Sequence, residues 1–210
     1  MTLPPANTVE QFVDLQFSLQ GRTVPLDYAS DLWDALRKFA PWLESDMLAG
    51  VHPLSGLSPG ENGNWYLSRR SRLTLRLARD GVVAAQALSG AHLQLAGCML
   101  EVGAAKLREL LHMPVLYSAF VTMGPVDESD FMQACQQELA AMDLAPRLIC
   151  GKAQRASTPQ GTLTGFSLML YDLNAAATAR LQRQGLGGER KRGCGIFVPH
   201  KTISAVGALE

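Results

Sequence analysis

Val13-Asp-Leu-Gln-Phe-Ser-Leu-Gln20 is the stretch of this 210-residue sequence that decides the fold. Its four apolar residues alternate with four polar ones, which is the period-two pattern of a strand with one buried face. After a short turn, apolar residues recur at helical spacing from Ala29 to Ala40, and Pro41 ends the run. The sequence therefore predicts a strand followed by a helix.

The segments after this helix extend the pattern to a β-α-β-β-α-β order. A short apolar segment at 47–51 and a clean alternation at 73–77 predict the second and third strands. Asp80 is a candidate N-cap for a short helix over 80–88, and alternation at 93–95 predicts the strand that follows. The first half of the chain thus has the element order of one complete α+β unit.

The second half of the sequence repeats this order. The predicted elements are a strand at 117–123, a helix at 127–142, strands at 147–153 and 166–170, a helix from its cap Asn174 to Gly185, and a short strand at 196–198. Two consecutive β-α-β-β-α-β units predict an α+β chain of two tandem ferredoxin-like domains with antiparallel sheets. We place the N-terminal domain at 1–113 and the C-terminal domain at 114–210.

The composition is that of a globular protein. Apolar residues make up 47% of the chain, which is ample for a buried core. No run approaches the roughly 18 apolar residues that a membrane-spanning helix needs, and the first twenty residues lack the pattern of a signal peptide. The four cysteines form no Cys-x-x-Cys pair, which disfavours a zinc ribbon or a disulfide framework. We expect a cytoplasmic protein with no membrane partner.

Charged residues balance in number but are sorted along the chain. Lys and Arg total 19, and Asp and Glu also total 19, so net charge alone does not indicate a nucleic-acid partner. Arginines crowd the segment at 69–76, and basic residues crowd 180–201, where Glu189 is the one acid. A neutral chain sorted in this way can still present a strongly positive face.

The most distinctive segment is Gly185-Leu-Gly-Gly-Glu-Arg-Lys-Arg-Gly-Cys-Gly-Ile-Phe-Val-Pro-His-Lys201. Glycines such as Gly187 and Gly188 let a backbone approach a ligand closely, and basic side chains donate charge-assisted hydrogen bonds to phosphate oxygens. The pattern favours a loop that tracks a phosphate backbone. The alternative is a helix end at Gly185 followed by a solvated basic turn. The candidate RNA-binding cations in this segment are Arg190, Lys191, Arg192 and Lys201.

This C-terminal motif resembles that of the CRISPR-associated RNA-processing endonucleases of the RAMP superfamily, family six. The resemblance extends along nearly the whole chain, and within the family it is greatest to members found with type I systems. The C-terminal motif is quite specific, whereas each of the other matching segments alone is weak. Those other segments are Val13–Gln20, Gly21–Pro25, Gly50–Leu54, Ser71–Leu77 and Gly165–Leu170.

The resemblance implies a metal-independent endoribonuclease that cuts the repeat of precursor CRISPR RNA. The 2′-hydroxyl beside the scissile bond attacks the phosphate, leaving a 2′,3′-cyclic phosphate and a 5′-hydroxyl. Such a reaction needs a base, an acid and cations around the phosphate, and we expect no metal and no other cofactor. The implied partners are the repeat hairpin and the subunits of a type I surveillance complex.

His52 is the candidate general base or acid, because imidazole exchanges protons near neutral pH. A lone histidine beside a proline is more often a loop or packing residue, but His52 matches the place where the family carries its catalytic histidine. Family members pair that histidine with a tyrosine, serine or lysine. Tyr28 is the first candidate partner and Ser68 the second, and Tyr28 could equally be a core residue on the helix stripe.

Three arginines after Ser68 complete the predicted site. Arg69 and Arg70 could clamp the phosphate or the hairpin stem, and Arg72 belongs to the same basic cluster. The alternative is that these side chains are simply solvated.

Two other functions fit the same fold. A non-catalytic RNA-binding subunit would hold the guide-RNA hairpin with the same basic loop, and it differs from the enzyme in showing no cleavage that depends on His52. A pair of acylphosphatase-like or regulatory domains would bind a small molecule instead of RNA, and the basic loop disfavours it.

Overall fold

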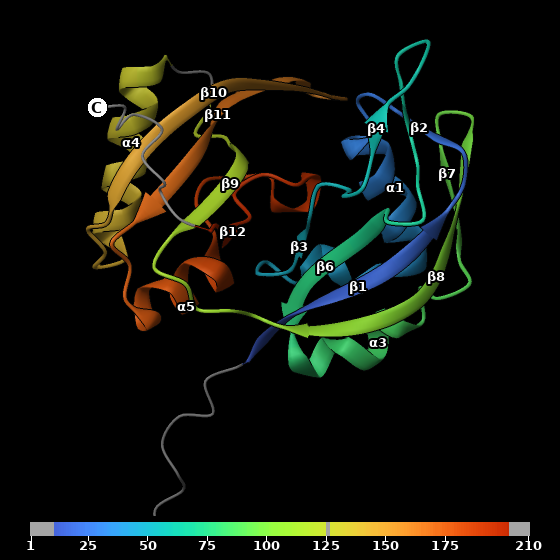
Figure 1. Cartoon of the computed structure of the whole chain (residues 1–210), viewed down its shortest axis with the longest axis horizontal. Helices are drawn as coiled ribbons and strands as arrows, with labels where there is room; N and C mark the ends of the chain where they lie inside the picture. Colours follow the sequence, from blue (N-terminus) through green and yellow to red (C-terminus); the bar gives the residue numbers. More distant parts are fainter. Residues whose placement is uncertain (1–10, 125–126, 202–210) are drawn as a thin grey trace, which may run out of the picture. The chain divides into compact units, whose positions relative to one another are not determined.

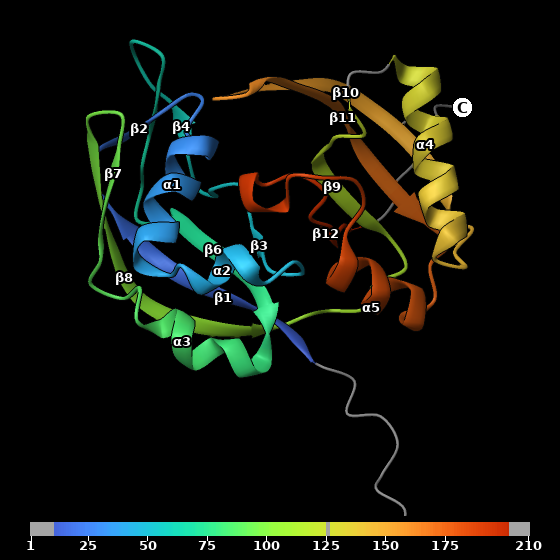
Figure 2. The ribbon, with the colours of Figure 1, turned by 180° about the vertical axis from the view of Figure 1, so that it is seen from behind.

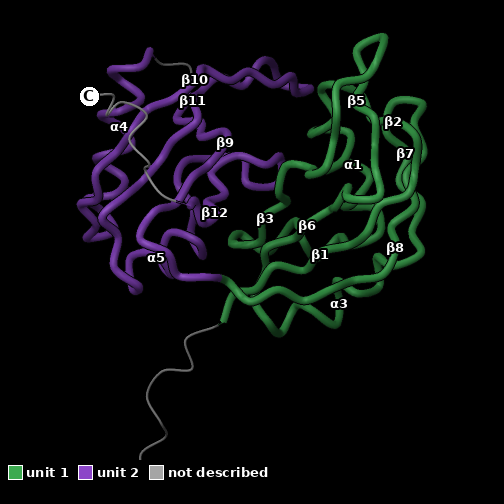
Figure 3. Tube along the Cα trace, viewed as in Figure 1, with its two compact units in different colours: residues 1–110 green, residues 111–210 purple. Residues whose placement is uncertain are grey.

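The computed structural model of the protein describes residues 11–124 and 127–201 (Figure 1). The chain divides into two compact units, residues 1–110 and 111–210 (Figure 3). This division falls three residues before the boundary predicted from the sequence. In the described parts of the chain, no helix is long and apolar enough to cross a membrane.

Unit 1 is built on a five-stranded sheet with the strand order β3-β6-β1-β8-β7, in which every neighbouring pair is antiparallel. The strands are β1 (Phe12–Gln20), β3 (Gly50–Val51), β6 (Arg72–Ala78), β7 (His92–Leu95) and β8 (Cys98–Glu109). The predicted strand at 13–20 is confirmed as β1. It is flanked by β6 and β8, so its polar residues lie in register with residues of both neighbours.

The helices of unit 1 bury their apolar stripes against one face of this sheet. They are α1 (Ala29–Phe39), α2 (Trp42–Ser45) and α3 (Val82–Gln86), with a 3-10 turn η1 at Arg79–Gly81. Figure 2 shows α1 and α2 in front of β1 and β6, and residues such as Leu32 and Leu36 of α1 pack with Leu15 and Phe17 of β1 in one core. The odd-numbered residues of β1 therefore face the helices, and its even-numbered residues face the opposite side of the sheet.

Two features of unit 1 differ from the predictions. The proposed cap Asp80 is wrong: this residue lies within η1, and the N-cap of α3 is Gly81, which makes no side-chain cap. The long strand β8 was not predicted, because a register shift opposite Ser18 interrupts its alternation. Apart from these differences, unit 1 contains a small sheet of order β2-β5-β4. Strand β2 (Thr23–Pro25) lies between β1 and α1, and β4 (Ser58–Pro59) and β5 (Asn64–Tyr66) lie in the segment before β6.

Unit 2 repeats the strand–helix order around a four-stranded antiparallel sheet of order β10-β11-β9-β12. Its elements are β9 (Leu116–Val121), α4 (Glu128–Ala141), β10 (Arg147–Thr158), β11 (Gly161–Tyr171), α5 (Ala175–Gln184), the 3-10 turn η2 (Arg190–Arg192) and β12 (Val198–Pro199). Asp127 caps α4 through Asp130 N at 2.9 Å, and the predicted cap Asn174 is confirmed by its bond from Ala177 N at 2.8 Å.

In the sequence, the alternation of Tyr117, Ala119, Val121 and Met123 predicts that these residues share the buried face of β9 (Leu116–Val121), and for Tyr117 and Ala119 this is wrong. Leu116 and Ser118 are buried, whereas Tyr117 and Ala119 face outward. A register shift between β9 and β11 then returns Val121 to the buried side. An extra residue in one strand breaks period-two alternation, so the sequence pattern alone gave the wrong face. The last strand, β12, is also shorter than predicted: it begins two residues later and ends one residue later than the predicted strand at 196–198.

Candidate functional site

Three polar side chains of unit 1 meet on the face of the sheet opposite the helices. Asp14 lies on β1 directly across from Arg76 on β6 in the strand register. His52 follows β3, and its backbone N–H donates to the carbonyl of Thr74 at 2.9 Å, which fixes it beside the same part of β6. We call Asp14, His52 and Arg76 the polar triad.

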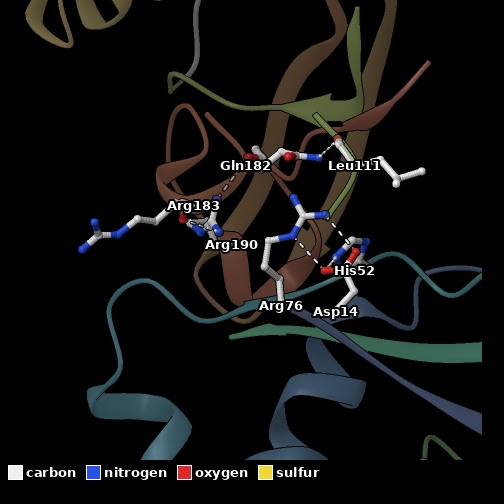
Figure 4. Close-up of polar contacts among 8 residues, drawn as sticks. Asp14, His52, Arg76, Leu111, Gln182, Arg183 and Arg190 are labelled. Carbon is white, nitrogen blue, oxygen red and sulfur yellow. Dashed lines mark hydrogen bonds and ion pairs between the residues drawn. The ribbon is translucent and has the colours of Figure 1, made fainter. Parts of the chain in front are cut away.

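The contacts within the polar triad are short and directional (Figure 4). Arg76 donates from Nε to Oδ1 of Asp14 at 2.8 Å and from Nη2 to Oδ2 at 2.9 Å, and His52 Nε2 lies 3.2 Å from the same Oδ1. The exposed fraction is 0% for the Arg76 side chain, 16% for Asp14 and 10% for His52. The carboxylate therefore joins the arginine to the histidine in a site largely removed from water.

Opposing effects act on the carboxyl group of Asp14. Burial raises its pKa, but the hydrogen bonds and positive charges of His52 and Arg76 together outweigh burial and hold the pKa of Asp14 well below its usual range. Asp14 is consequently ionised at neutral pH, and it presents a negative charge to His52.

Asp14 and Arg76 were missed as site residues by the sequence reasoning. Both occupy polar positions of alternating strands, where a charged side chain is usually solvated. The signal that could have found them is an acid and a base at facing positions of two adjacent strands, and that signal requires the strand register.

Tyr28 is placed at the N-terminal end of α1, and its hydroxyl accepts a hydrogen bond from the backbone N–H of Leu54 at 2.7 Å. Burial raises the pKa of Tyr28 to about 12. The side chain also packs against the core of unit 1. Tyr28 thus holds the backbone two residues after His52, and its phenol stays neutral at physiological pH.

Ser68 lies in an exposed turn that is tied to Gly56. Its hydroxyl donates to the Gly56 carbonyl at 2.9 Å and accepts from the Arg70 N–H at 3.1 Å. Arg72 donates from Nη1 to the Arg69 carbonyl at 2.8 Å, so it holds the same turn from the other side. Arg69 and Arg70 are exposed on it. The structure therefore connects Ser68 with the loop after His52 through Gly56.

In unit 2 the glycine-rich segment packs its backbone against β9 and α4. Gly187 N–H donates to Oε1 of Glu138 at 3.0 Å, and Gly188 N–H donates to the Thr122 carbonyl at 3.2 Å. Gly187 has a φ of +72°, and a Cβ there would lie well inside contact distance of the Thr122 carbonyl oxygen. A Cβ on Gly188 would meet open space. Position 187 therefore requires glycine, whereas position 188 has room for a side chain.

The basic residues of this segment have unequal surroundings. Arg190 is buried, and it donates to the carbonyls of Gly195 at 3.4 Å and Arg183 at 3.1 Å (Figure 4). Arg192 forms an ion pair with Glu189. Lys191 is half-buried and Lys201 is exposed. Arg190 therefore stabilises the loop by binding its backbone carbonyls, so it serves as an internal brace of the loop. The sequence instead predicts that Arg190 contacts a phosphate of the RNA.

Within residues 11–124 and 127–201, no group of three or more His, Cys, Asp or Glu side chains is placed to hold a metal ion. The polar triad contributes one histidine and one carboxylate, and the carboxylate is already engaged by Arg76. Its arrangement suits proton transfer and charge stabilisation.

Comparison with known proteins gives consistent matches along the chain. The family model described as Cas6 Crispr matches residues 13–202. A protein of Myxococcus xanthus strain DK1622, the CRISPR-associated endonuclease Cas6, is 36% identical over 189 residues, which covers 90% of this chain and 81% of the relative.

Solved structures show the same fold at low sequence identity. A CRISPR-associated protein Cas6 is 10% identical with a TM-score of 0.65, and the match covers 91% of this chain and all of that one. A RAMP protein described as binding different RNA substrates is 12% identical with a TM-score of 0.64, covering 89% of this chain and 98% of that one. From the family match and the relative's identity, the chain belongs to the Cas6 family of CRISPR-associated endonucleases.

Proposed function

We propose that this protein matures CRISPR RNA as a metal-independent endoribonuclease, cutting precursor RNA within each repeat. The 2′-hydroxyl attacks the adjacent phosphate, and the products are a 2′,3′-cyclic phosphate and a 5′-hydroxyl. Its membership of a family of CRISPR-associated endonucleases supports the reaction class. The observation that carries the residue assignment is the position of His52, held against an ionised carboxylate in the polar triad.

The chemistry needs proton transfer at two oxygens and positive charge around the phosphate. A positioned histidine contributes roughly 10²- to 10⁴-fold as a general acid or base. Tyr28 has its hydroxyl engaged by Leu54 N–H and a raised pKa, so we assign it to positioning the His52 segment. Ser68 positions the neighbouring turn through Gly56 in the same way.

RNA binding in this proposal uses basic residues of both units. In unit 1 these are Arg69 and Arg70, which are exposed on the turn that Arg72 and Ser68 hold. In unit 2 the glycine-rich segment offers Lys191, Arg192 and Lys201, with Arg190 as the internal brace. A structurally similar RAMP protein that binds RNA substrates supports this assignment.

We also propose that each unit is a ferredoxin-like domain. In unit 1 the order β3-β6-β1-β8 and in unit 2 the order β10-β11-β9-β12 place the first and third strands of each β-α-β-β-α-β repeat side by side in the middle of the sheet. The domain with the catalytic histidine is N-terminal, and the domain with the RNA-binding loop is C-terminal. After cleavage the enzyme stays on the repeat hairpin as a subunit of a type I surveillance complex.

The test is single-turnover cleavage of the cognate repeat RNA in EDTA by the wild type and by His52→Ala. A repeat with a 2′-deoxy nucleotide at the cut site serves as the substrate control. We expect the wild type to cut, while the variant loses about 10²- to 10⁴-fold in rate and keeps its affinity for RNA. The deoxy substrate stays intact because it lacks the nucleophile. Strict dependence on a divalent ion would contradict the mechanism.

A non-catalytic RNA-holding subunit is the second candidate. The 10% exposed fraction of the His52 side chain favours it, because a catalytic imidazole must reach the RNA. Tight binding of the repeat by the wild type without any cleavage would establish this function instead.

A further inference from the structure

We propose that Tyr66 stacks on an unpaired base of the repeat RNA close to the cut, and that the guanidinium of Arg22 binds an adjoining phosphate. Tyr66 lies on β5, and Arg22 comes directly before β2 in the same small sheet. The inference rests on the proposed ribonuclease function. It adds a contact to an RNA base, whereas the basic residues named above contact the phosphate backbone.

The register of the small sheet directs the Tyr66 side chain away from the core of unit 1. Trp65 of β5 is opposite Val24 of β2, and both side chains pack in that core, as does Leu67. Because successive side chains on a strand point to opposite faces, Tyr66 points outward, and it is half-buried. In Figures 1 and 2 the loop that joins β4 to β5 projects beyond α1. Tyr66 therefore belongs to the outer face of a projecting hairpin.

The neighbours of Tyr66 support its ring without fully covering it. Its cross-strand neighbours are Thr23 on β2 and Ser58 on β4, both of which have short side chains. The ring lies against Gly60, where a Cβ would be 3.2 Å from Cδ2 of Tyr66. Gly60 is held in turn by its N–H, which donates to the carbonyl of Asn64 at 3.0 Å. The backbone of the hairpin thus supports an aromatic ring with short side chains beside it, which suits stacking of a planar base.

The charges around Tyr66 suit a nucleotide. The N–H of Leu67 donates to the carbonyl of Arg22 at 3.0 Å, so Arg22 lies next to the strand pair that contains Tyr66. The Arg22 side chain is exposed, and so is that of Arg69, three residues after Tyr66. In the segment at 56–72 the one acid is Glu61, in the turn of the hairpin. Guanidinium groups bind phosphate oxygens through charge-assisted hydrogen bonds, so cations beside an aromatic ring favour RNA as the ligand.

The chain connects this ring to the candidate catalytic residue over a short path. Ser58, which is opposite Tyr66, follows His52 by six residues, so their Cα atoms are at most about 20 Å apart. The connecting segment is also held in place, because the carbonyl of Gly56 accepts a hydrogen bond from Ser68 at 2.9 Å. A base stacked on Tyr66 therefore lies within a few nucleotides of a cut made at His52.

The test measures binding without cleavage. The probe is the repeat RNA with a 2′-deoxy nucleotide at the cut site, and fluorescence anisotropy gives its affinity. Tyr66→Ala should bind about 5- to 100-fold more weakly than the wild type, which is the usual loss when a stacking side chain is removed. Tyr66→Phe is the matched control, because it keeps the ring and should bind like the wild type. Circular dichroism and urea unfolding check that both variants fold.

A set of probes that each lack one base identifies the stacked nucleotide. Loss of that base should weaken binding by the wild type to a similar extent, and should have no further effect on Tyr66→Ala, because the interaction is already absent. All other missing bases should affect the two proteins equally. Arg22→Ala should lower the slope of log affinity against log salt by about one and keep the coupling between Tyr66 and the base.

The outcomes separate this inference from the proposed function. Wild-type affinity in Tyr66→Ala, or an equal loss in Tyr66→Phe, would overturn the stacking contact. A loss in Tyr66→Ala that is the same for every probe would show that the ring only supports the hairpin. Coupling to a base in the loop of the RNA hairpin would contradict a position close to the cut, and an unchanged salt slope in Arg22→Ala would remove the phosphate contact.

The cleavage reaction is followed independently on the all-ribonucleotide repeat. Each of the failures above leaves wild-type cleavage unaffected, so the ribonuclease function would stand without the stacking site. If the wild type binds the repeat and never cuts it, the proposed function fails, and the coupling between Tyr66 and one base can still be measured.

Discussion

The guanidinium of Arg76 donates to both carboxylate oxygens of Asp14, at 2.8 and 2.9 Å, from the facing position on the neighbouring strand. The same carboxylate contacts His52, so a residue of β1 links a fully buried arginine to the candidate catalytic ring. The pairing affects folding stability as well as the proposed chemistry, and the two effects can be measured separately.

Removing the carboxylate should destabilise the protein. In Asp14→Ala the guanidinium of Arg76 stays buried without its counter-ion, and breaking a buried pair in this way costs about 3 kcal/mol or more. The free energy of unfolding from urea titration measures the effect. The matched control is Asp34→Ala, which removes a carboxylate from an exposed pair with Arg37 and should change stability by less than about 0.5 kcal/mol. Equal changes in the two variants would contradict the ion-pair account.

Low pH should lower the folding stability of the wild type more than that of Asp14→Asn, which has no carboxyl group to titrate at position 14. The pKa of Asp14 is lowered by folding, so its contribution is fully present above the unfolded value near 4 and is lost as the pH falls below that value. Between pH 5 and pH 3 the wild type should lose about 1 kcal/mol more stability than Asp14→Asn. Urea unfolding at the two pH values gives this difference, and parallel losses would show that Asp14 titrates normally.

Gly187→Ala should impair RNA binding while Gly188→Ala does not. At Gly187 the added methyl group meets the Thr122 carbonyl and the backbone has a positive φ, so the loop must shift. At Gly188 the methyl group meets nothing within 4 Å. Since strain of this kind costs of order 1–3 kcal/mol, we expect about a tenfold or greater loss in the affinity of Gly187→Ala for the repeat hairpin. Similar affinities for both variants would remove the loop from the binding site.

The double variant Arg69→Ala with Arg70→Ala should bind RNA with a weaker dependence on salt. Both side chains are exposed, and each phosphate contact that is lost reduces the slope of log affinity against log salt by about one. Fluorescence anisotropy across a salt series measures the slope. The control is Arg37→Ala, whose side chain pairs with Asp34 on α1. If the double variant keeps the wild-type slope, these arginines are only solvated.

Tyr28→Phe distinguishes positioning from proton transfer. The change leaves the Leu54 N–H without its acceptor, which should lower stability by about 1–3 kcal/mol. Cleavage should fall by less than about tenfold at saturating enzyme if Tyr28 positions the His52 segment, as we propose, and does not transfer a proton. A loss of 10² or more with normal folding would restore Tyr28 as a catalytic residue.

Several site features follow from local sequence alone. The alternation of Val13–Gln20 identifies β1 because side chains on a strand point to opposite faces in turn. Asn174 caps α5, and Gly185 ends it with a φ of +74°. The segment at 185–201 could be recognised as distinctive because its glycines and basic residues are contiguous.

The features of the fold that were not predicted correctly depend on pairing between strands that are distant in the sequence. The register shift opposite Ser18 obscured β8, and the shift beside Phe166 reversed the expected face of Tyr117. The sequence predicts a loop rich in Pro, Gly and Ser at 53–64, and it does not predict β4 and β5, because these strands are only two and three residues long. Each of these features depends on a partner strand far away in the sequence.

The sequence by itself determined the main strands and helices from their local patterns, and its C-terminal motif carried the resemblance to the family. That resemblance, and not the local pattern around it, pointed to His52 as the candidate catalytic residue. Only the tertiary structure decided that Asp14 and Arg76 contact each other and that His52 joins them, because residues 38 and 62 positions away from Asp14 meet it only through strand pairing. The structure also shows that Arg190 is buried and Lys201 is exposed, although both are basic residues of one segment. A side chain's charge is set by its type, but what that charge does depends on which atoms the fold places around it.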